Sequence, residues 1–433
     1  MASELVERGS QRLEWIRSRM SLLAAAREEF AASQPFAGRR IGVAIHLDPK
    51  TAVLLEVLAA GGAEVIATGN HGSTQDDMVA VLREQGLVVF GRRDDTIEQH
   101  HANVASVLDA RPDMILDNGA DLIAGVVERG VAGDIVGATE ETTSGADRLR
   151  GELQGRLPFP VIVINDSPLK AIGENRHAVG QSVVESLMRI TGLMVPGRRF
   201  VVVGYGWCGR GIAQYLRALG GRVAIAEVDD LKAFEAAIDG YRVAAIAELA
   251  GWAQTVVTAT GRPGVLGPSE FALLESGTVL ANSGHFDWEI DVPALTASAS
   301  RVVPVDDAIE RVEFADGRHV VLLAGGRMVN LAGRDPRGNS LESMDLGFLL
   351  QALSLERIAR SAAELPFGAQ PVPDDLNPLI ARRRVAAMSS SRGARRPRPD
   401  RTTRFPPSTR PWTSWNSSPG DPAASARRRS PTR

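Results

Sequence analysis

The sequence contains a single cysteine, Cys208, among 433 residues. One thiol cannot form an internal disulfide bond, so a secreted fold held together by disulfides is excluded. No cluster of cysteine and histidine has the spacing of a zinc site, so we expect no metal ion. Such low cysteine usage is typical of a cytosolic protein, and a cytoplasmic location is the expectation.

Long apolar runs and an export signal are also absent. The longest apolar runs, such as the one around residues 201–203, are much shorter than the roughly 20 residues that span a bilayer. The first residues, MASELVERGSQRLEW, lack the order of basic and then apolar residues that a signal peptide has. We therefore expect neither a membrane span nor export.

Charge is distributed unevenly. The net charge is −3, but residues 389–433 hold eleven arginines, two aspartates and no lysine or glutamate. Their local charge of +9 leaves −12 for the first 388 residues. The same segment is rich in Pro, Ser and Thr, so it cannot bury enough apolar surface to offset the entropy of ordering. We expect residues 373–433 to form a divergent, largely disordered tail, solvated rather than bound to nucleic acid.

Short apolar runs alternate with helical patterns in two series along the chain. The first thirty residues have an amphipathic helical pattern. The first series predicts strands at residues 41–45, 63–68, 87–90, 114–116, 134–136 and 161–164. The second predicts strands at residues 199–203, 222–226, 255–258, 277–280 and 319–323. Helices are predicted at residues 51–60, 176–191, 209–219 and 344–358.

Strands this apolar are typical of parallel sheets that helices cover on both faces. The sequence therefore predicts an α/β protein with two doubly wound parallel-sheet domains. The first domain is expected to span residues 1–175, completed by residues 333–372. The second, expected to bind a dinucleotide, spans residues 176–332.

A glycine-rich turn lies between a predicted strand and a predicted helix of the second domain. It contains Gly204, Gly206 and Gly209, and Glu227 ends the next strand. In this setting backbone amides and a helix N-terminus can bind a pyrophosphate, while the carboxylate accepts hydrogen bonds from a ribose. Because a carboxylate would repel the 2′-phosphate of NADP, Glu227 favours NAD.

Polar clusters follow several of the predicted strands directly, at the carboxyl edge where open α/β sheets bind ligands. Each cluster alone has an ordinary explanation, since Asp166 and Ser167 are good helix caps and residues 117–119 form a typical turn sequence. Their shared position favours a functional site. The clusters lie at residues 45–48, 73–76, 117–121, 140–145, 165–170 and 283–287.

Longer stretches of the sequence carry a family resemblance. HLDPKTAVLLEVLAAGGAEV, GATEETTSGADRL, VINDSPLK, VVVGYGWCGRGIAQYLRALGGRVAIAEVD and NSGHFDWEIDV, in this order, resemble S-adenosylhomocysteine hydrolase. The resemblance runs from about residue 13 to about residue 335. It implies a substrate domain, a Rossmann domain with bound NAD, and a homo-oligomer, usually a tetramer. The implied substrate is an adenosine-type nucleoside or S-adenosylhomocysteine.

In this family NAD takes a hydride from the 3′-carbon of the sugar, the group on C5′ is eliminated, water adds to the alkene, and the hydride returns. The resemblance implies that Lys170 handles the 3′-hydroxyl proton, and a lysine flanked by carboxylates is a sensible base. Glu141 and His285 match ribose-side partners, and His46 matches the histidine near the departing 5′ group. The positions that match contacts to NAD are Thr142, Thr143, Asn175 and Asn330.

Several positions depart from the family pattern. Asn118 replaces an aspartate near the 4′ and 5′ carbons, and an amide cannot exchange that proton at neutral pH. Glu174 replaces an aspartate beside the ribose, which moves the carboxylate by one methylene.

The substrate-binding end differs as well. Asp48 and Lys50 replace a Thr and a Glu in the purine-binding stretch, which reverses a charge. Arg337 lies in the segment that replaces a Gly-His-Pro loop over the substrate. The family's C-terminal segment, which reaches a neighbouring subunit's NAD site with a Lys and a Tyr, has no counterpart after Pro371.

These departures fall on the substrate side, whereas Lys170, Glu141, His285 and the glycine turn remain. The preferred hypothesis is a diverged NAD-dependent member that eliminates across C4′–C5′ of a nucleoside and keeps the alkene. Such a dehydratase or lyase would serve the biosynthesis of a nucleoside antibiotic. The alternative is a true S-adenosylhomocysteine hydrolase that gives adenosine and homocysteine. A catalytically silent NAD-binding regulator is a second alternative.

Overall fold

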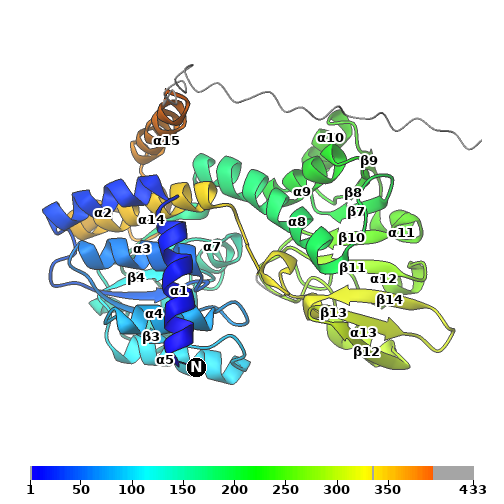
Figure 1. The fold of residues 1–433 in the computed structure, drawn as a ribbon, viewed down its shortest axis with the longest axis horizontal. Helices are drawn as coiled ribbons and strands as arrows, with labels where there is room; N and C mark the ends of the chain where they lie inside the picture. The colour runs from blue at the N-terminus through cyan, green and yellow to red at the C-terminus, as the bar shows by residue number, and fades with distance from the viewer. Residues whose placement is uncertain (1, 334–335, 394–433) are drawn as a thin grey trace, which may run out of the picture. The chain divides into compact units, whose positions relative to one another are not determined.

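The computed structural model describes residues 2–333 and 336–393 of the chain. The strands form two sheets, and helices flank each of them (Figure 1). The fold class predicted from the sequence, an α/β protein with two mainly parallel sheets, is confirmed. Among the described residues, no helix is long and apolar enough to cross a membrane.

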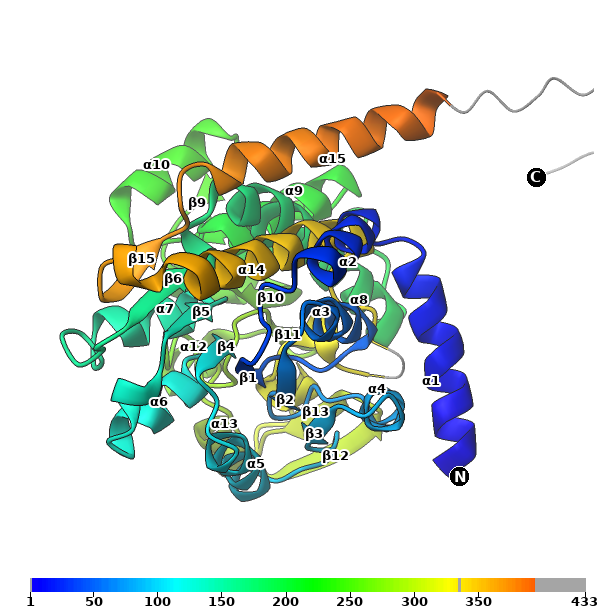
Figure 2. The same cartoon turned by 90° about the vertical axis from the view of Figure 1, so that its left-hand side faces the viewer.

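The first sheet has seven strands in the order β15-β6-β5-β4-β1-β2-β3, and all neighbouring pairs are parallel. The strands are β1 (Arg40–Ala44), β2 (Glu64–Thr68), β3 (Val88–Phe90), β4 (Met114–Asp117), β5 (Gly137–Glu140), β6 (Pro160–Val163) and β15 (Gly368–Pro371). The helices are α1 (Ala2–Arg17), α2 (Ser21–Ser33), α3 (Pro49–Ala60), α4 (Asp76–Glu84), α5 (Ile97–Asp109), α6 (Asp121–Glu128), α7 (Thr143–Arg150) and α14 (Leu341–Ser361). Figure 2 shows how β15, from late in the chain, lies beside β6.

The second sheet has eight strands in the order β12-β13-β14-β11-β10-β7-β8-β9. They are β7 (Arg199–Val203), β8 (Arg222–Ala226), β9 (Arg242–Val243), β10 (Thr255–Thr258), β11 (Thr278–Asn282), β12 (Arg301–Asp306), β13 (Ile309–Glu313) and β14 (His319–Leu323). The helices are the π-helix η3 (Lys170–Ala178), α8 (Val179–Thr191), α9 (Trp207–Ala218), α10 (Asp230–Ile238), α11 (Ile246–Leu249), α12 (Pro268–Leu273) and α13 (Val292–Ser298). The pairing is parallel except at one edge, where β12, β13 and β14 are antiparallel.

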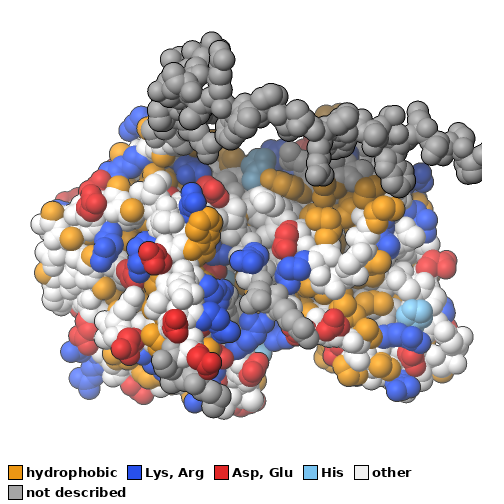
Figure 3. Space-filling view, in the orientation of Figure 1, with side chains coloured by type: hydrophobic (Ala, Val, Ile, Leu, Met, Phe, Trp, Pro, Cys, Tyr) orange, Lys and Arg blue, Asp and Glu red, His pale blue; other side chains and the backbone are white. Residues whose placement is uncertain are grey.

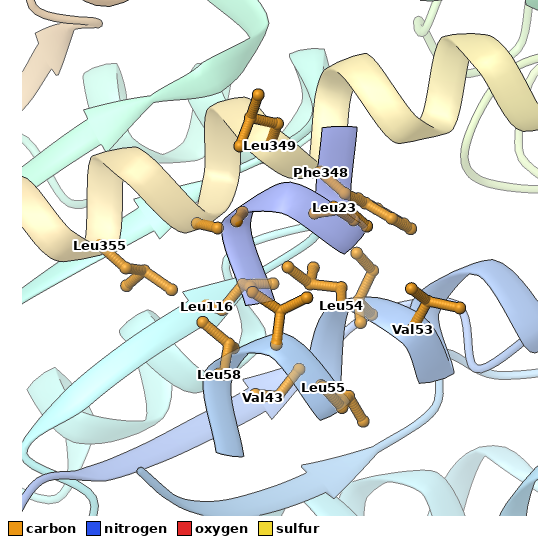
Figure 4. Packing of buried hydrophobic residues seen from close by; sticks show 14 of the residues in the cluster. Leu23, Val43, Val53, Leu54, Leu55, Leu58, Leu116, Phe348, Leu349 and Leu355 are labelled. Atoms are coloured by element: carbon orange, nitrogen blue, oxygen red, sulfur yellow. The ribbon is translucent and has the colours of Figure 1, made fainter. Parts of the chain in front are cut away.

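Apolar side chains of strands and helices interlock in the core of the first sheet. Val43 of β1 and Leu116 of β4 point toward α3, where Leu54 and Leu58 are fully buried (Figure 4). Phe348 of α14 closes the same cluster from the other side. Strands with buried residues on both faces are what a helix-covered parallel sheet requires.

Two expectations from the sequence were wrong. The apolar run at residues 134–136 is not a strand, because β5 is the following segment Gly137–Glu140. This strand lies between β4 and β6 and ends in a buried, hydrogen-bonded carboxylate, so apolar content did not reveal it. The tail expected to be disordered from residue 373 instead begins with α15 (Leu376–Gly393). Its Ala, Leu and Arg residues favour a helix, and Leu376 and Ile380 are buried. The rest of that tail lies outside the described residues.

The amphipathic pattern of the first thirty residues is divided between α1 and α2. Met20 at the start of α2 supplies no side-chain cap. Instead Asp345 of α14, which is fully buried, accepts hydrogen bonds from the backbone N–H groups of Leu22 and Leu23, both at 2.9 Å. A carboxylate from far along the chain thus caps this helix. Burial raises the pKa of Asp345 to about 6, although the two N–H groups oppose this shift.

We expect Asp345→Ala to lower the free energy of unfolding by about 1–3 kcal/mol, because two buried N–H groups lose their acceptor. The pH dependence is a sharper check. Between about pH 4 and pH 6 folded Asp345 holds a proton that the unfolded chain has lost, so this group makes the folded state less stable as the pH rises. Asp345→Asn cannot titrate, so its deficit relative to the parent protein in urea unfolding should shrink over this range.

The matched control is Glu28→Gln, which changes an exposed carboxylate on α2, the helix that Asp345 caps. Its difference from the parent should vary less over this pH range than that of Asp345→Asn. A deficit of Asp345→Asn that stays constant from pH 4 to pH 6 would contradict the assignment.

Candidate active site

Polar side chains gather at the carboxyl ends of strands in the first sheet. Parallel strands end at one common edge, and open α/β sheets bind ligands there. Hydrogen bonds join side chains from the segments that follow β1, β2, β4, β5 and β6 into one network. Its members are His46, Asn70, Ser73, Asn118, Glu141, Lys170 and Glu174.

A buried ion cluster lies at the centre of this network. The Nζ atom of Lys170 is 3.1 Å from Oε1 of Glu141 and 2.7 Å from Oε1 of Glu174. Lys170, Glu141 and Glu174 are only 3%, 3% and 6% exposed, respectively. Burial alone would lower the pKa of Lys170, but the charges of the two carboxylates outweigh it and raise this pKa well above the usual value. Lys170 is therefore an ammonium ion that donates hydrogen bonds to both carboxyl groups.

The second oxygen of Glu174 is an available acceptor. Its Oε2 atom is buried and has no hydrogen-bond partner among the described residues. Burial raises the pKa of Glu174, and the charge of Lys170 opposes that rise. A buried acceptor without a donor is costly in a folded protein, which indicates that a ligand group is expected at this atom.

The π-helix η3 presents both residues to the site. Lys170 begins this helix and Glu174 follows one turn later. The carbonyl of Glu174 accepts a hydrogen bond from Val179, five residues on, which is the pattern of a π-helix. Such wide turns are rare and occur often at functional sites.

Asn118 holds Glu141 in place. Its Nδ2 atom donates a hydrogen bond to Oε2 of Glu141 at 2.9 Å. Asn70 donates through its own Nδ2 to Oδ1 and to the backbone oxygen of Asn118, both at 3.0 Å. These contacts fix the orientation of the Asn118 amide, with its donor toward the carboxylate. Asn118 therefore orients the carboxyl group of Glu141 and does not itself titrate.

Glu140 organises the turn that carries Asn118. Its carboxylate accepts hydrogen bonds from the backbone N–H groups of Gly119, Ala120 and Thr142, at 2.7–3.0 Å. The hydroxyl of Thr142 donates to it as well. Burial raises the pKa of Glu140 to about 7, and these donors act in the opposite direction. The residue is fully buried and acts as a support below the site.

Two histidines lie near this cluster. The rings of His46, which follows β1, and His285, which follows β11, have centroids 5.5 Å apart. His285 also lies beside the turn at Gly119, where a Cβ added to the glycine would be 3.3 Å from the Nε2 atom of His285. Burial lowers the pKa of His46 to about 4 and that of His285 to about 3. Both rings are neutral at pH 7.

The glycine turn of the second sheet has the geometry for a pyrophosphate. Gly204 has φ +96°, a conformation that favours glycine. A Cβ on Gly209 would lie 2.0 Å from the backbone oxygen of Gly204, so only glycine lets α9 start this close to β7. A Cβ on Gly206 would meet no atom within 4 Å, so the space beside this residue is open to a ligand. The turn thus leaves the N-terminus of α9 accessible.

Glu227 lies beside this turn, at the carboxyl end of β8. Its Oε2 atom accepts a hydrogen bond from the backbone of Tyr205 at 2.6 Å, and Oε1 accepts one from Val228 at 2.7 Å.

Asn330 is buried and donates to Ser182 at 3.1 Å, whereas its Oδ1 atom has no partner among the described residues. An unpaired acceptor of this kind fits an amide ligand group.

The remaining predicted cofactor residues have local partners. Thr142 caps α7 by accepting a hydrogen bond from Gly145 at 3.0 Å, and Thr143 begins this helix. Asn175 donates to Asn165 at 3.1 Å. Among the described residues, no hydrogen bond links these three side chains to the glycine turn.

Close packing of helices places the ion cluster near the glycine turn. A Cβ on Gly211 of α9 would lie 1.8 Å from the backbone oxygen of Arg176 in η3, and one on Gly180 would lie 2.6 Å from Gly211. The two backbones therefore approach as closely as glycine allows. The charges of Lys170 and Glu174 act on Cys208 at the start of α9, and burial raises the pKa of this thiol to about 12.

A cavity of about 580 Å³ adjoins the site, between α1, the start of α3, α8 and residues 336–341. Lys and Arg side chains gather beside α1 on this face (Figure 3). The ammonium group of Lys50 contacts Asp48 at 2.9 Å and the backbone oxygens of Arg337 and Asn339 at 2.7 and 3.1 Å. These acceptors use all three N–H bonds of Lys50. Lys50 thus holds the segment after residue 335, and the exposed Arg337 side chain lines the cavity.

Asp48 has a second structural task. Its Oδ1 atom accepts hydrogen bonds from the backbone N–H groups of Lys50 and Thr51, at 2.8 and 3.0 Å, and so caps α3. Asp48 and Lys50 are the charged residues that the sequence resemblance assigned to a purine-binding stretch, and they are paired with each other. Neither charge is left free for a nucleobase.

Sequence reasoning selected most of this site but gave no role to Asn70, Ser73 and Glu140. Asn70 follows β2 at the carboxyl edge, which was the available signal, and Ser73 lies in the polar cluster noted at residues 73–76. Glu140 lies within a noted polar cluster, but its supporting role depends on the turn at residues 119–120.

Among residues 2–333 and 336–393, no group of three His, Cys, Asp or Glu side chains could hold a metal ion.

The glycine turn, the acidic residue after β8 and the adjacent lysine cluster define an NAD-dependent enzyme. The family model of S-adenosyl-L-homocysteine hydrolase matches residues 2–132, and that of its NAD-binding domain matches residues 175–335. The chain belongs to this family, as the sequence resemblance had indicated.

Several curated relatives are similar over nearly their whole length. The S-inosyl-L-homocysteine hydrolase of Methanopyrus kandleri is 42% identical over 389 residues, covering 89% of this chain and 91% of that protein. The S-inosyl-L-homocysteine hydrolase of Methanothermobacter thermautotrophicus is 41% identical, covering 89% and 93%. The adenosylhomocysteinase of Thermococcus kodakarensis is 41% identical, covering 89% and 92%.

We expect Lys170→Ala to lower the free energy of unfolding by about 3–5 kcal/mol, because it leaves two buried carboxylates without a cation. The double variant Lys170→Met with Glu174→Gln should recover part of this loss, since it removes one of those charges. Lys232→Ala, which disrupts an exposed pair with Asp229, is the matched control and should cost less than about 1 kcal/mol. Equal losses for Lys170→Ala and Lys232→Ala in urea unfolding would contradict the burial of the cluster.

Two glycine variants separate folding from cofactor binding. Gly206→Ala should unfold at the same temperature as the parent without NAD, because its Cβ enters open space. It should nevertheless bind NAD at least about tenfold more weakly by calorimetry, since that space receives the pyrophosphate. Gly209→Ala should lose both stability and binding, because its Cβ meets a backbone oxygen. Unchanged NAD affinity in Gly206→Ala would show that the cofactor binds elsewhere.

Proposed function

We propose that the protein hydrolyses an S-nucleosyl-L-homocysteine to a nucleoside and homocysteine, with NAD as its resident cofactor. The Lys170–Glu141–Glu174 cluster beside the glycine turn is the observation that supports this most directly. The curated relatives with 41–42% identity are named as hydrolases of S-inosyl- or S-adenosylhomocysteine. They favour the hydrolase over the dehydratase that the sequence suggested first.

The residues present fit the cofactor. The turn at Gly204, Gly206 and Gly209 would hold the pyrophosphate, Glu227 the adenosine ribose, and the unpaired Oδ1 atom of Asn330 the carboxamide. Bound NAD supplies reversible removal of a hydride from the 3′-carbon of the sugar.

On the 3′ side of the sugar the chain offers one acceptor and one cation. The buried Oε2 atom of Glu174 can accept the 3′-hydroxyl proton, because no donor among the described residues occupies it. The ammonium ion of Lys170, 2.7 Å from the other oxygen of Glu174, stabilises the negative charge that then develops on the 3′-oxygen. In this assignment Lys170 acts first as a fixed positive charge, which agrees with its raised pKa.

On the 5′ side the chain offers two neutral imidazoles. Asn118 cannot take or give a proton at neutral pH, so proton exchange near C4′ and C5′ falls to His46 and His285. Their low pKa values keep both rings neutral at pH 7, and a neutral imidazole has one atom that donates and one that accepts. The pair can therefore exchange protons in both directions.

A dehydratase remains the second candidate because of Asn118. Where the family has a carboxylate, this chain has an amide that is bound to Glu141. If the missing carboxylate is needed to add water to the alkene, the reaction stops after elimination.

The two candidates give different products. Purified protein with NAD and either S-inosyl- or S-adenosyl-L-homocysteine should release homocysteine and the nucleoside in equal amounts, measured by thiol labelling and mass spectrometry. In deuterium oxide the nucleoside should gain one deuterium at C4′, since the proton removed there is replaced from solvent. Loss of one water from adenosine or inosine would instead establish the dehydratase.

The controls use variants that the structure predicts to fold. Gly206→Ala should lower product formation at NAD concentrations that only just saturate the parent protein, and excess NAD should restore part of it, whereas the exposed variant Glu342→Gln should not differ from the parent. No product from any of these substrates, in protein shown to bind NAD, would overturn both candidates and favour the regulator.

A further inference from the structure

Ser73 connects His46 to the backbone of the site. The Nδ1 atom of His46 lies 2.7 Å from the hydroxyl oxygen of Ser73, and this hydroxyl lies 3.0 Å from the backbone oxygen of Asn70. Neither Ser73 nor Asn70 has a role in the function proposed above.

The position of Ser73 is fixed by a tight turn after β2. The backbone N–H of Ser73 bonds to the oxygen of Asn70 at 3.2 Å, which closes a four-residue turn. Gly72, the third residue of this turn, has φ +72°, which favours glycine there. A Cβ on Gly69 would lie 1.9 Å from the hydroxyl of Thr74, so the chain has little room to shift. The hydroxyl of Ser73 is therefore held against the ring.

The number of protons decides the direction of these two hydrogen bonds. A serine hydroxyl has one proton to donate and can accept as well. If Ser73 donates to Asn70, the proton between Ser73 and His46 must belong to Nδ1, and both contacts are hydrogen bonds. If Ser73 donates to His46, its contact with the oxygen of Asn70 is lost. The first arrangement makes one more hydrogen bond, so it is favoured.

We infer that Ser73 is a positioning residue that holds His46 in the tautomer protonated at Nδ1, which leaves Nε2 as the proton acceptor on the 5′ side of the sugar. The inference rests on the proposed hydrolysis. When water adds to C5′ of the alkene, its O–H bond breaks, a C–O bond forms, and the alkene electron pair moves onto the 3′-ketone as an enolate. The proton goes to Nε2, and Nδ1–H stays bound to Ser73.

Asn70 joins this arrangement to the ion cluster. Its backbone oxygen accepts from Ser73, while its side-chain amide donates to Asn118, which in turn donates to Glu141. One residue thus orients the neutral acid–base group on one side and the charged group on the other. The hydrogen bonds between Asn70 and Asn118 use amide protons, which do not titrate. No titrating proton is therefore shared between Asn118 and the hydrogen bonds that set the tautomer of His46.

The first test measures the tautomer directly. Protein with ¹⁵N-labelled histidine, loaded with NAD at pH 7, should show a protonated Nδ1 and an unprotonated Nε2 for His46, with its signals identified by their loss in His46→Gln. In Ser73→Ala this pattern should change toward a mixture of tautomers, whereas in Ser73→Thr it should persist. A protonated Nε2 in the parent protein would overturn the inference, whatever the activity.

The second test separates the two sides of the sugar. Ser73→Ala should slow homocysteine release about tenfold to a hundredfold through kcat, with little change in KM. This loss reaches at most the lower end of the usual contribution of one acid–base group, because the variant keeps the imidazole and loses only its orientation. Reduction of bound NAD by adenosine or inosine should stay within about twofold, because Lys170 and Glu174 are untouched. Ser73→Thr should restore release to within about threefold.

The matched control is the remote variant Ser106→Ala, which removes a hydroxyl that, among the described residues, donates to the backbone oxygen of Ala102 within α5. Equal loss of NAD reduction and of homocysteine release in Ser73→Ala would show a merely structural role and overturn the inference. If the parent protein releases no homocysteine, the proposed function fails, but the tautomer measurement still decides the position of the proton.

Discussion

The burial of one ammonium ion between two carboxylates is the constraint on which the rest of the site depends. Lys170, Glu141 and Glu174 are all buried, and one ammonium group lies between the two carboxyl groups. Such a cluster persists only when hydrogen bonds satisfy its atoms. Asn118 supplies one donor to Glu141. A carboxylate in place of Asn118 would add another buried carboxyl group to the cluster, so the amide at this position and the cluster suit each other.

The same cluster depends on the contact between two helices. Lys170 and Glu174 belong to a π-helix whose continuation packs against α9, and glycines at positions 180 and 211 make the backbones touch. The glycine turn ends where α9 begins. One packing interaction therefore fixes both the charged residues and the dinucleotide turn, although Lys170 follows a strand of the first sheet and the turn follows a strand of the second. A larger residue at position 211 would disturb both sites together, since its Cβ has no space.

Both sheets could be predicted because most of their strands are short apolar runs that are buried on both faces. The strand Gly137–Glu140 could not be predicted in this way, because it includes residues that serve the site. It is a strand because β4 and β6 pair with it on its two sides, and its composition does not show this. The break between α1 and α2 depends on Asp345, more than three hundred residues later. The site residues were predicted from family motifs, but the partners of Lys50 are backbone oxygens at residues 337 and 339, which no local pattern indicates.

The pairing of Lys50 with Asp48 changes how the departures from the family pattern are understood. Without Asp48, the positive charge of Lys50 would change the electrostatic potential at His46. The two residues act on His46 in opposite directions, since the charge of Asp48 raises its pKa and that of Lys50 lowers it. The two charges therefore offset each other in part at the imidazole, where Asp48 acts more strongly than Lys50. The charge of Lys50 also reaches Glu174, where it opposes the rise in pKa that burial causes. This end of the site is thus coupled electrostatically to the groups on both sides of the sugar, while Lys50 holds the segment that borders the cavity.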